Sequence, residues 1–253
     1  PERAVVFAAV GFETTAPASA AAVLAAEQKG LENFSILASH KLVMPAMRAL
    51  LSDPEIAIDG FLCPGHVSVI IGSEAYRPIV EEYGSPCVVV GFEALQIIQG
   101  IVRRTELVQA GTPALENLYP QVVRPAGNPH ALRLLDQVFE PCDEAWRALG
   151  EIGVSGLRLR EAYRKFDAVD RFGVEFGDDR EPPGCRCGEV ITGRVRPDEC
   201  PLFSKVCTPL YPIGPCMVSS EGACQAWFRY RRHETKQRER AARNDEAVAT
   251  QEG

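Results

Sequence analysis

Residues 185–224 read CRCGEVITGRVRPDECPLFSKVCTPLYPIGPCMVSSEGAC, and this stretch decides the fold of the carboxy-terminal part of the chain. It holds six of the nine cysteines, at Cys185, Cys187, Cys200, Cys207, Cys216 and Cys224. A chain of 253 residues can bury a sizeable core and does not need disulfides to stabilise it. Metal or redox chemistry is therefore the expected reason for this local density of cysteines.

Three kinds of cysteine chemistry fit this block. A [4Fe-4S] cluster needs four thiolates on loops that wrap around it, and the Pro and Gly residues beside these cysteines favour such loops. Zinc is the main competitor, although structural zinc sites usually contain C-x2–4-C pairs, and none of the gaps here matches. Unliganded disulfides are the third possibility. The pattern favours the cluster, which leaves two cysteines to spare.

The first hundred residues alternate short apolar runs with helical stretches. The runs AVVFAAVGF, NFSILAS, IDGFLCPG and CVVVGF are rich in Val, Ile and Phe, and they predict strands buried on both faces at 4–12, 33–39, 58–65 and 87–92. Helices are expected at 17–29, 45–51, 67–83 and 94–110. This alternation indicates an α/β fold with a parallel, doubly wound sheet.

Gly and Pro interrupt this pattern after residue 110 and suggest a domain boundary. We predict an α/β parallel-sheet domain at 1–112, a smaller, mostly helical and loop-rich cluster domain at 113–235, and a charged, disordered tail at 236–253. Helices in the second domain are expected at 132–139 and 157–166. The first residue is Pro1 rather than Met, which suggests that the natural amino terminus is missing.

Polar side chains follow each of the four predicted strands. Ligands of parallel α/β sheets bind at the carboxyl ends of the strands, so these side chains are expected together at one edge. Glu13, His66 and Glu93 are the candidates for function in that cleft. Each also has a purely structural interpretation, because His66 could cap a helix, Glu13 could accept from helix-start amides, and Glu93 could open the next helix. His40 and Lys41 follow the second strand and are weaker candidates.

The charge of the chain argues against two classes of partner. Its formal net charge is −7 and its isoelectric point is near 5.3, and the basic residues cluster only at the tail. We therefore expect no nucleic-acid partner and no membrane partner. No run of 18 or more apolar residues is present, so the sequence predicts a cytoplasmic protein.

Four motifs together resemble the HypD family of hydrogenase maturation factors over nearly the whole chain. They are GFETTAP, CPGHVSVIIG, GFE and the cysteine block, at residues 11–17, 63–72, 91–93 and 185–224. The resemblance implies that four cysteines spaced C-x14-C-x6-C-x16-C bind a [4Fe-4S] cluster, namely Cys185, Cys200, Cys207 and Cys224. It also implies that Cys187 and Cys216 form a redox dithiol beside the cluster. Such a pair can couple one-electron to two-electron chemistry.

The resemblance further implies a function in the maturation of [NiFe] hydrogenase. The protein would assemble the Fe(CN)2CO group, a transient iron with cyanide and carbon monoxide ligands, together with a HypC-type chaperone and a HypE-type cyanide donor. It would be a maturation scaffold with redox activity rather than a free-standing enzyme. The alternatives are a zinc- or disulfide-stiffened protein-binding module without redox activity, and a free-standing disulfide reductase.

The sequence departs from the family pattern in two places. Members carry upstream cysteine motifs, in an amino-terminal domain, that are thought to hold the iron under construction, and this chain does not contain that region. Ser204 also stands where the family's CPLFG stretch has glycine. The first departure puts in doubt whether the chain by itself completes the reaction.

Overall fold

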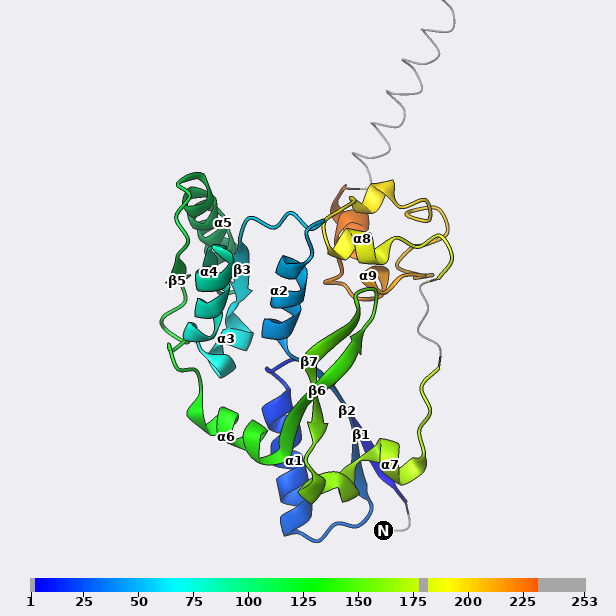
Figure 1. Ribbon diagram of the computed structural model, residues 1–253. Helices are drawn as coiled ribbons and strands as arrows, with labels where there is room; N and C mark the ends of the chain where they lie inside the picture. Colours follow the sequence, from blue (N-terminus) through cyan, green and yellow to red (C-terminus); the bar gives the residue numbers. More distant parts are fainter. Residues whose placement is uncertain (1–2, 178–181, 232–253) are drawn as a thin grey trace, which may run out of the picture. The chain divides into compact units, whose positions relative to one another are not determined.

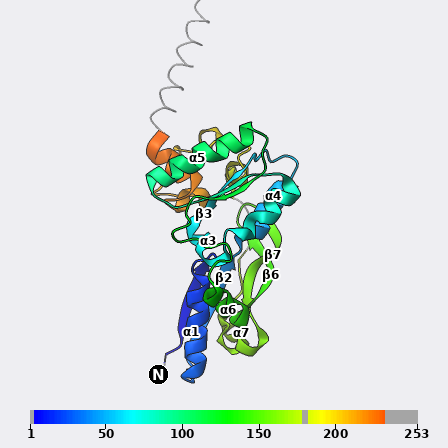
Figure 2. The same cartoon turned by 90° about the vertical axis from the view of Figure 1, so that its left-hand side faces the viewer.

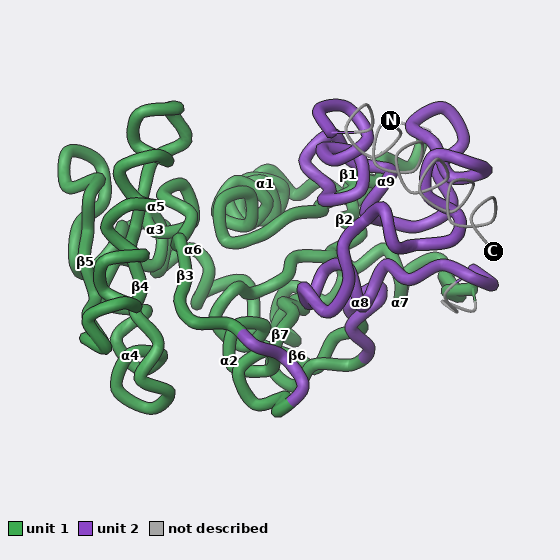
Figure 3. The backbone as a smooth tube through the Cα atoms, turned by 90° about the horizontal axis from the view of Figure 1, so that it is seen from above, with its two compact units in different colours: residues 1–54, 58–145, 151–177 green, residues 55–57, 146–150, 178–253 purple. Residues whose placement is uncertain are grey.

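The computed structural model describes residues 3–177 and 182–231, so the predicted tail at 236–253 lies outside the described residues. The chain divides into two compact units (Figure 3). Unit 1 comprises residues 1–54, 58–145 and 151–177, and unit 2 comprises residues 55–57, 146–150 and those from 178 onward. Residues 113–145 and 151–177 thus group with the earlier part of the chain, whereas the sequence analysis places a boundary after residue 112.

The first sheet of unit 1 has four strands in the order β1-β2-β7-β6 (Figure 1). Its strands are β1 (Val5–Gly11), β2 (Phe34–Lys41), β6 (Phe139–Trp146) and β7 (Gly150–Leu159). Strands β1 and β2 are parallel over their whole length, and β7 pairs antiparallel with the end of β2. Helices α1 (Ala16–Gln28) and α6 (Pro129–Val138) contact each other, and their buried side chains share a core with this sheet.

The second sheet of unit 1 has three parallel strands, β3 (Phe61–Pro64), β4 (Cys87–Val90) and β5 (Leu115–Asn117). Helix α5 (Ala94–Gln109) lies along its outer face, toward the viewer in Figure 2. Side chains at alternate positions of β4 belong to two different apolar clusters, one shared with α5 and the other with α2 and α4. This strand is therefore buried on both faces.

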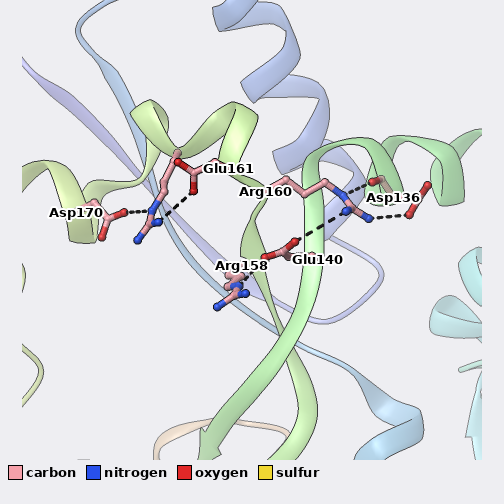
Figure 4. Close-up of polar contacts among 7 residues, drawn as sticks. Asp136, Glu140, Arg158, Arg160, Glu161 and Asp170 are labelled. Atoms are coloured by element: carbon pink, nitrogen blue, oxygen red, sulfur yellow. Dashed lines mark hydrogen bonds and ion pairs between the residues drawn. The ribbon is translucent and has the colours of Figure 1, made fainter.

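Short helices complete unit 1. They are α2 (Val43–Ser52), α3 (Gly65–Ile71), η1 (Glu74–Tyr76), α4 (Arg77–Tyr83), η2 (Glu161–Phe166) and α7 (Ala168–Phe172). Ion pairs join α6, the β6–β7 hairpin and the segment after it (Figure 4). Arg160 Nη2 lies 3.0 Å from Asp136 Oδ1, Arg158 Nε lies 2.8 Å from Glu140 Oε1, and Arg164 Nε lies 2.6 Å from Asp170 Oδ2.

The four predicted strands exist, but they do not form one sheet. Strands β1 and β2 belong to the four-stranded sheet, and β3 and β4 belong to the three-stranded sheet. The prediction of a single edge carrying all the polar strand ends is therefore wrong. Burial on both faces is confirmed for β4 but is wrong for β1, where Val10 is 64% exposed and Phe7 is 46% exposed. An edge strand has one neighbour, so its apolar side chains find fewer partners.

Two predicted helices differ in the structure. The helix expected at 67–83 breaks into α3, η1 and α4 at Gly72, which has a φ of 89° and whose added Cβ would lie 2.2 Å from Pro125 O. The helix expected at 157–166 begins instead as the end of β7 and continues as η2. Leu157 and Leu159 are buried while Arg158 between them is exposed, which is the two-residue period of a strand.

Of the helices in the described part of the chain, none combines the length and the apolar character that a membrane crossing requires.

Candidate functional site

The cysteine block forms the core of unit 2. Its regular structure in the described residues consists of the short helices α8 (Cys187–Ile191), η3 (Pro197–Glu199) and α9 (Pro215–Val218), and of a helix at residues 223–231 that contains Cys224. The buried side chains are mostly thiols, and they belong to Cys187, Cys200, Cys207, Cys216 and Cys224, with Cys185 partly buried beside them. Six residues spread over forty positions of the sequence are thus brought into one cluster.

One short contact joins two of the sulfurs, and backbone amides donate to two others. The Cys216 thiol donates to Cys224 Sγ at 3.0 Å, and the backbone N–H of Cys216 donates to Cys187 Sγ at 3.3 Å. The backbone N–H of Ile213 donates to Cys207 Sγ at 3.4 Å. Cys216 therefore lies beside Cys187, its predicted dithiol partner, and also beside Cys224, a predicted cluster ligand.

The turn before Cys216 has no room for a side chain at Gly214. A Cβ added at Gly214 would lie 2.5 Å from Cys185 Sγ and 3.5 Å from Cys187 Cβ. Pro215 follows directly and is the first residue of α9. Glycine at this position therefore allows the 213–216 turn to approach two of the six cysteines closely.

The backbone conformation at Ser204 shows why the family pattern has glycine at this position. It lies in the turn between Cys200 and Cys207, where its backbone N–H donates to Cys207 O at 3.1 Å, and its φ is 59°. This left-handed conformation favours glycine, which is the residue that the resemblance leads us to expect here. Serine adopts it at a cost in backbone strain.

The environment of the thiols is apolar. The cysteines line one small hollow together with Val190, Leu202, Phe203, Gly214 and Met217. The Cys187 contact lowers the pKa of the Cys216 thiol, but the Cys224 contact and burial outweigh it and raise that pKa to about 12. Burial and the neighbouring sulfur therefore favour the neutral thiol over the thiolate at this position.

The donor set fits an iron-sulfur cluster. Thiolate is the usual ligand of such clusters, and the described lining of the hollow contributes sulfur donors and apolar side chains rather than carboxylates or imidazoles. Among residues 3–177 and 182–231, no three His, Cys, Asp or Glu side chains converge closely enough for a single metal ion. A cube with one thiolate at each iron needs more widely separated sulfurs than a single ion does. The family resemblance, rather than the geometry, implies that Cys185, Cys200, Cys207 and Cys224 would hold it.

The strand-end residue Glu13 lies in the loop that joins β1 to α1, and it is buried. One carboxylate oxygen, Oε1, accepts from the backbone N–H of Val43 at 2.9 Å, where α2 begins. The other oxygen, Oε2, has no hydrogen-bond partner among the described residues. Burial raises the pKa of Glu13, and the Val43 contact opposes that shift. The structure thus contains the predicted contact to a helix-start amide. The second carboxylate oxygen, Oε2, is not used in that contact.

His40 is more prominent in the structure than the sequence suggested. It is fully buried at the end of β2, directly opposite Gly11 of β1, and its Nε2 lies 3.2 Å from Ser19 Oγ. Its Nδ1 has no partner in the part of the chain that is described, and burial lowers its pKa to about 4. The sequence analysis ranked it among the weaker candidates, although its position at a strand end was the available signal.

His66 and Glu93 lie at the end of the other sheet. The exposed His66 ring stacks on Phe92 with 4.4 Å between ring centroids. Glu93 precedes α5, and its backbone N–H donates to Gln96 Oε1 at 3.3 Å, so it does open the next helix. The structure therefore brings His66 and Glu93 to one strand edge and Glu13 and His40 to another.

Fold and site together define a class of protein, an α/β protein with a buried cluster of six thiols. Residues 1–231 match the family model described as "HypD: Hydrogenase formation hypA family". The chain belongs to this HypD family, which confirms the resemblance.

Curated proteins agree with this assignment. The chain is 47% identical over 236 residues to the hydrogenase maturation factor HypD of Rhodobacter capsulatus, covering 91% of this chain and 62% of that protein. It is 42% identical over 239 residues to HypD of Escherichia coli, covering 93% of this chain and 64% of that protein. A putative hydrogenase expression/formation protein of Methanocaldococcus jannaschii is 40% identical over 231 residues, covering 91% and 64%. The chain thus spans somewhat less than two thirds of the length of these relatives.

Proposed function

We propose that this protein is a scaffold for the maturation of [NiFe] hydrogenase that binds a [4Fe-4S] cluster next to a redox-active dithiol. Cys185, Cys200, Cys207 and Cys224 are the cluster ligands, and Cys187 and Cys216 form the dithiol. The family assignment supports the maturation function. The observation that carries the redox part is the gathering of all six thiols around one apolar hollow.

The chain's own residues prepare this site in three ways. Gly214 lets the 213–216 turn contact Cys185, and the backbone amides of this turn donate to Cys207 and Cys187. Hydrogen bonds to sulfur stabilise the thiolate over the thiol. Val190, Phe203 and Met217 exclude water, because they are buried against the cysteines.

The contact between Cys216 and Cys224 places the proposed dithiol next to a proposed ligand. The two sulfurs are 3.0 Å apart. A bound cluster supplies electrons one at a time, and reduction of a disulfide takes two. Direct contact between a ligand and the dithiol would allow such coupling.

The substrate of the scaffold is the iron that acquires two cyanides and one carbon monoxide. In this proposal a HypC-type chaperone and a HypE-type cyanide donor are the partners. The strand-end candidates lie at two different edges, Glu13 at one and His66 and Glu93 at the other. Glu13 is the best supported of the three, because it is buried and has an oxygen without a partner among the described residues.

Anaerobic purification with metal analysis tests the cluster. We expect about four irons and four acid-labile sulfides per chain and a broad absorption near 400 nm, as is typical of such clusters. Stoichiometric zinc without sulfide, persisting after anaerobic reconstitution with iron and sulfide, would contradict the proposal and favour the stiffened binding module.

A second assay separates the scaffold from a disulfide reductase. The reduced protein is offered a generic disulfide without the chaperone or the cyanide donor. A maturation scaffold should leave this substrate unreduced, whereas a free-standing reductase should turn it over.

A further inference from the structure

One buried hydrogen-bond donor of unit 2 has no acceptor among the described residues. It is the indole N–H of Trp227, whose Nε1 atom is buried and makes no hydrogen bond in that part of the chain. A buried indole N–H usually finds an acceptor, and leaving it without one costs free energy. Such a donor calls for an explanation, and a group that is present only in the complete site supplies one.

Trp227 lies on the helix that carries one of the proposed cluster ligands. Residues 223–231 form this helix, and Cys224 stands three positions before Trp227. Residues three apart lie on the same face of a helix, so Trp227 follows Cys224 along the face that packs against the thiols. The contacts agree with this placement, because the Trp227 and Phe228 side chains both pack against the buried cysteine core.

The side-chain acceptors within this core are sulfurs. Besides its cysteines, the core contains apolar residues and Met217, and the residues that line the hollow are of the same kinds. Gln225, on the same helix, does not serve as the acceptor, because its buried Oε1 also lacks a partner in the described chain. Positions two apart on a helix do not face each other. The indole N–H is therefore placed where a cysteine sulfur can accept from it.

The position of Trp227 behind the hollow favours a ligand sulfur as the acceptor. Cys224 lines the hollow and Trp227 does not, so the indole stands outside the lining. A donor there reaches the outer side of a ligand sulfur rather than an inorganic sulfide inside the hollow. Cys224 is the proposed ligand on the same helix, and its sulfur already accepts from the Cys216 thiol at 3.0 Å. A thiolate sulfur has more than one lone pair and can accept a second hydrogen bond.

Arg231 makes the indole a stronger donor. Its guanidinium carbon lies 4.7 Å from the centre of the Trp227 ring, which is within the range of a cation–π contact. A cation over the face of an indole withdraws electron density from the ring, and the N–H bond then becomes more polar. Arg231 is also one turn after Trp227 on the helix, so the contact is formed by neighbours on one helix face.

We propose that the Trp227 indole N–H donates a hydrogen bond to Cys224 Sγ in the cluster-bound protein and thereby raises the reduction potential of the cluster. One-electron reduction adds negative charge that the ligand sulfurs share, so a donor to such a sulfur stabilises the reduced state. Trp227 is a positioning residue, because it acts on the cluster through Cys224. This inference rests on the proposed function, in which Cys224 is a ligand.

A redox titration of the anaerobically reconstituted protein tests the inference. Trp227→Phe keeps an aromatic ring and removes the N–H, so it should keep its iron and sulfide while its midpoint potential becomes more negative. The equilibrium constant for reduction should fall about tenfold, which corresponds to about 59 mV for one electron. Tyr230→Phe is the matched control, because it removes a polar hydrogen from an exposed ring on the same helix and should leave the potential unchanged.

The outcomes separate the inference from the proposed function. If the unsubstituted protein holds iron and sulfide and Trp227→Phe has the same potential, the hydrogen bond is wrong while the proposed function stands. If the unsubstituted protein holds zinc without sulfide, the proposed cluster fails, and the inference about Trp227 fails with it.

An isotopic label on the indole nitrogens detects the hydrogen bond without relying on a variant. In pulsed electron paramagnetic resonance of the reduced protein, the labelled Trp227 nitrogen should show a hyperfine coupling to the cluster. Trp146→Phe removes the other tryptophan and should keep this coupling, which identifies its source. No coupling in the unsubstituted protein would overturn the proposal, and this result decides the question even if Trp227→Phe does not assemble a cluster.

Discussion

The three-stranded sheet of unit 1 and the cysteine cluster of unit 2 are both buried, but different side chains fill them. Val88, Val89 and Ile79 form ordinary apolar contacts between strands and helices. In unit 2 the equivalent positions are thiols, and apart from the helix at residues 223–231 the helices among its described residues have at most five residues. Unit 1 has helices of up to sixteen residues.

This difference indicates what each unit needs in order to fold. A helix of five residues is not stable without tertiary contacts, and thiols bury little apolar area. Unit 2 is therefore expected to depend on crosslinks between its cysteines, whereas unit 1 is expected to fold on its apolar core alone. The predictions that follow test this contrast.

The largest expected effect is the loss of a cluster ligand. Cys200→Ser should remove most of the bound iron and the visible absorption, because a cube that lacks one thiolate is unstable. Backbone amides of unit 2 should then lose protection from hydrogen exchange, while those of β4 and α5 should keep theirs. The measurements are iron content and exchange followed by mass spectrometry.

Cys216→Ser is the matched control for that variant. It removes a buried thiol of the same cluster that we assign to the dithiol, so the iron and the colour should remain, while maturation activity measured in the full-length context should be lost. A colourless Cys216→Ser protein would contradict the division of the cysteines into ligands and dithiol.

His40 should make unit 1 sensitive to acid. Its pKa is about 4 in the folded state and near 6.5 in the unfolded state, so the unfolded state takes up the proton first as the pH falls. The stability that neutral His40 contributes is complete above pH 6.5 and is lost between pH 6.5 and 4, by up to about 3 kcal/mol. Denaturant unfolding across this range should become flatter in His40→Gln. The exposed His130→Gln should behave like the unsubstituted protein.

The apolar strands β4 and β1 should respond differently to the same change. Val89→Ala removes two methyl groups from a fully buried site and should cost about 2 kcal/mol of unfolding free energy. Val5→Ala, at a position that is 52% exposed, should change it by less than about 0.5 kcal/mol. Equal losses in chemical denaturation would show that β1 is covered in solution.

The smallest effect is expected at Ser204. Ser204→Gly relieves the left-handed conformation and should stabilise unit 2 by up to about 1 kcal/mol, since glycine's greater freedom in the unfolded state offsets part of the gain. Resistance of the visible absorption to denaturant measures it. Ser204→Ala keeps a Cβ at this φ and should give no gain. A less stable glycine variant would show that the hydroxyl matters more than the backbone.

The comparison of β1 with β4 also shows which features of the fold can be predicted from the sequence. Both runs are apolar enough to predict strands, and both strands exist. Which strands share a sheet depends on contacts between distant residues, so the split into two sheets could not be read from local patterns. The same limit concealed the β6–β7 hairpin, because β7 ends inside the segment 157–166 that the sequence analysis predicted as a helix.

The cysteine block was more informative, because the six thiols gather in the structure as their density suggested. Spacing alone did not divide them into ligands and dithiol, and that division came from the family resemblance. His40 was underestimated for a different reason. His40 lies within β2, and it is buried where β7, a strand distant in the sequence, pairs with the end of β2.

The pairing of β2 with β7 also affects the order of events during synthesis. Lys41 Nζ donates to Ala145 O at 2.8 Å across 104 residues of chain, and the whole three-stranded sheet is encoded between these two positions. The three-stranded sheet is therefore synthesised before the β6–β7 hairpin, which completes the four-stranded sheet. At a typical synthesis rate of about 5–20 residues per second, several seconds pass between the synthesis of β2 and that of β7, its second neighbour in the sheet. During that interval the nascent chain exposes an open sheet edge, which is the state in which a chaperone would protect it.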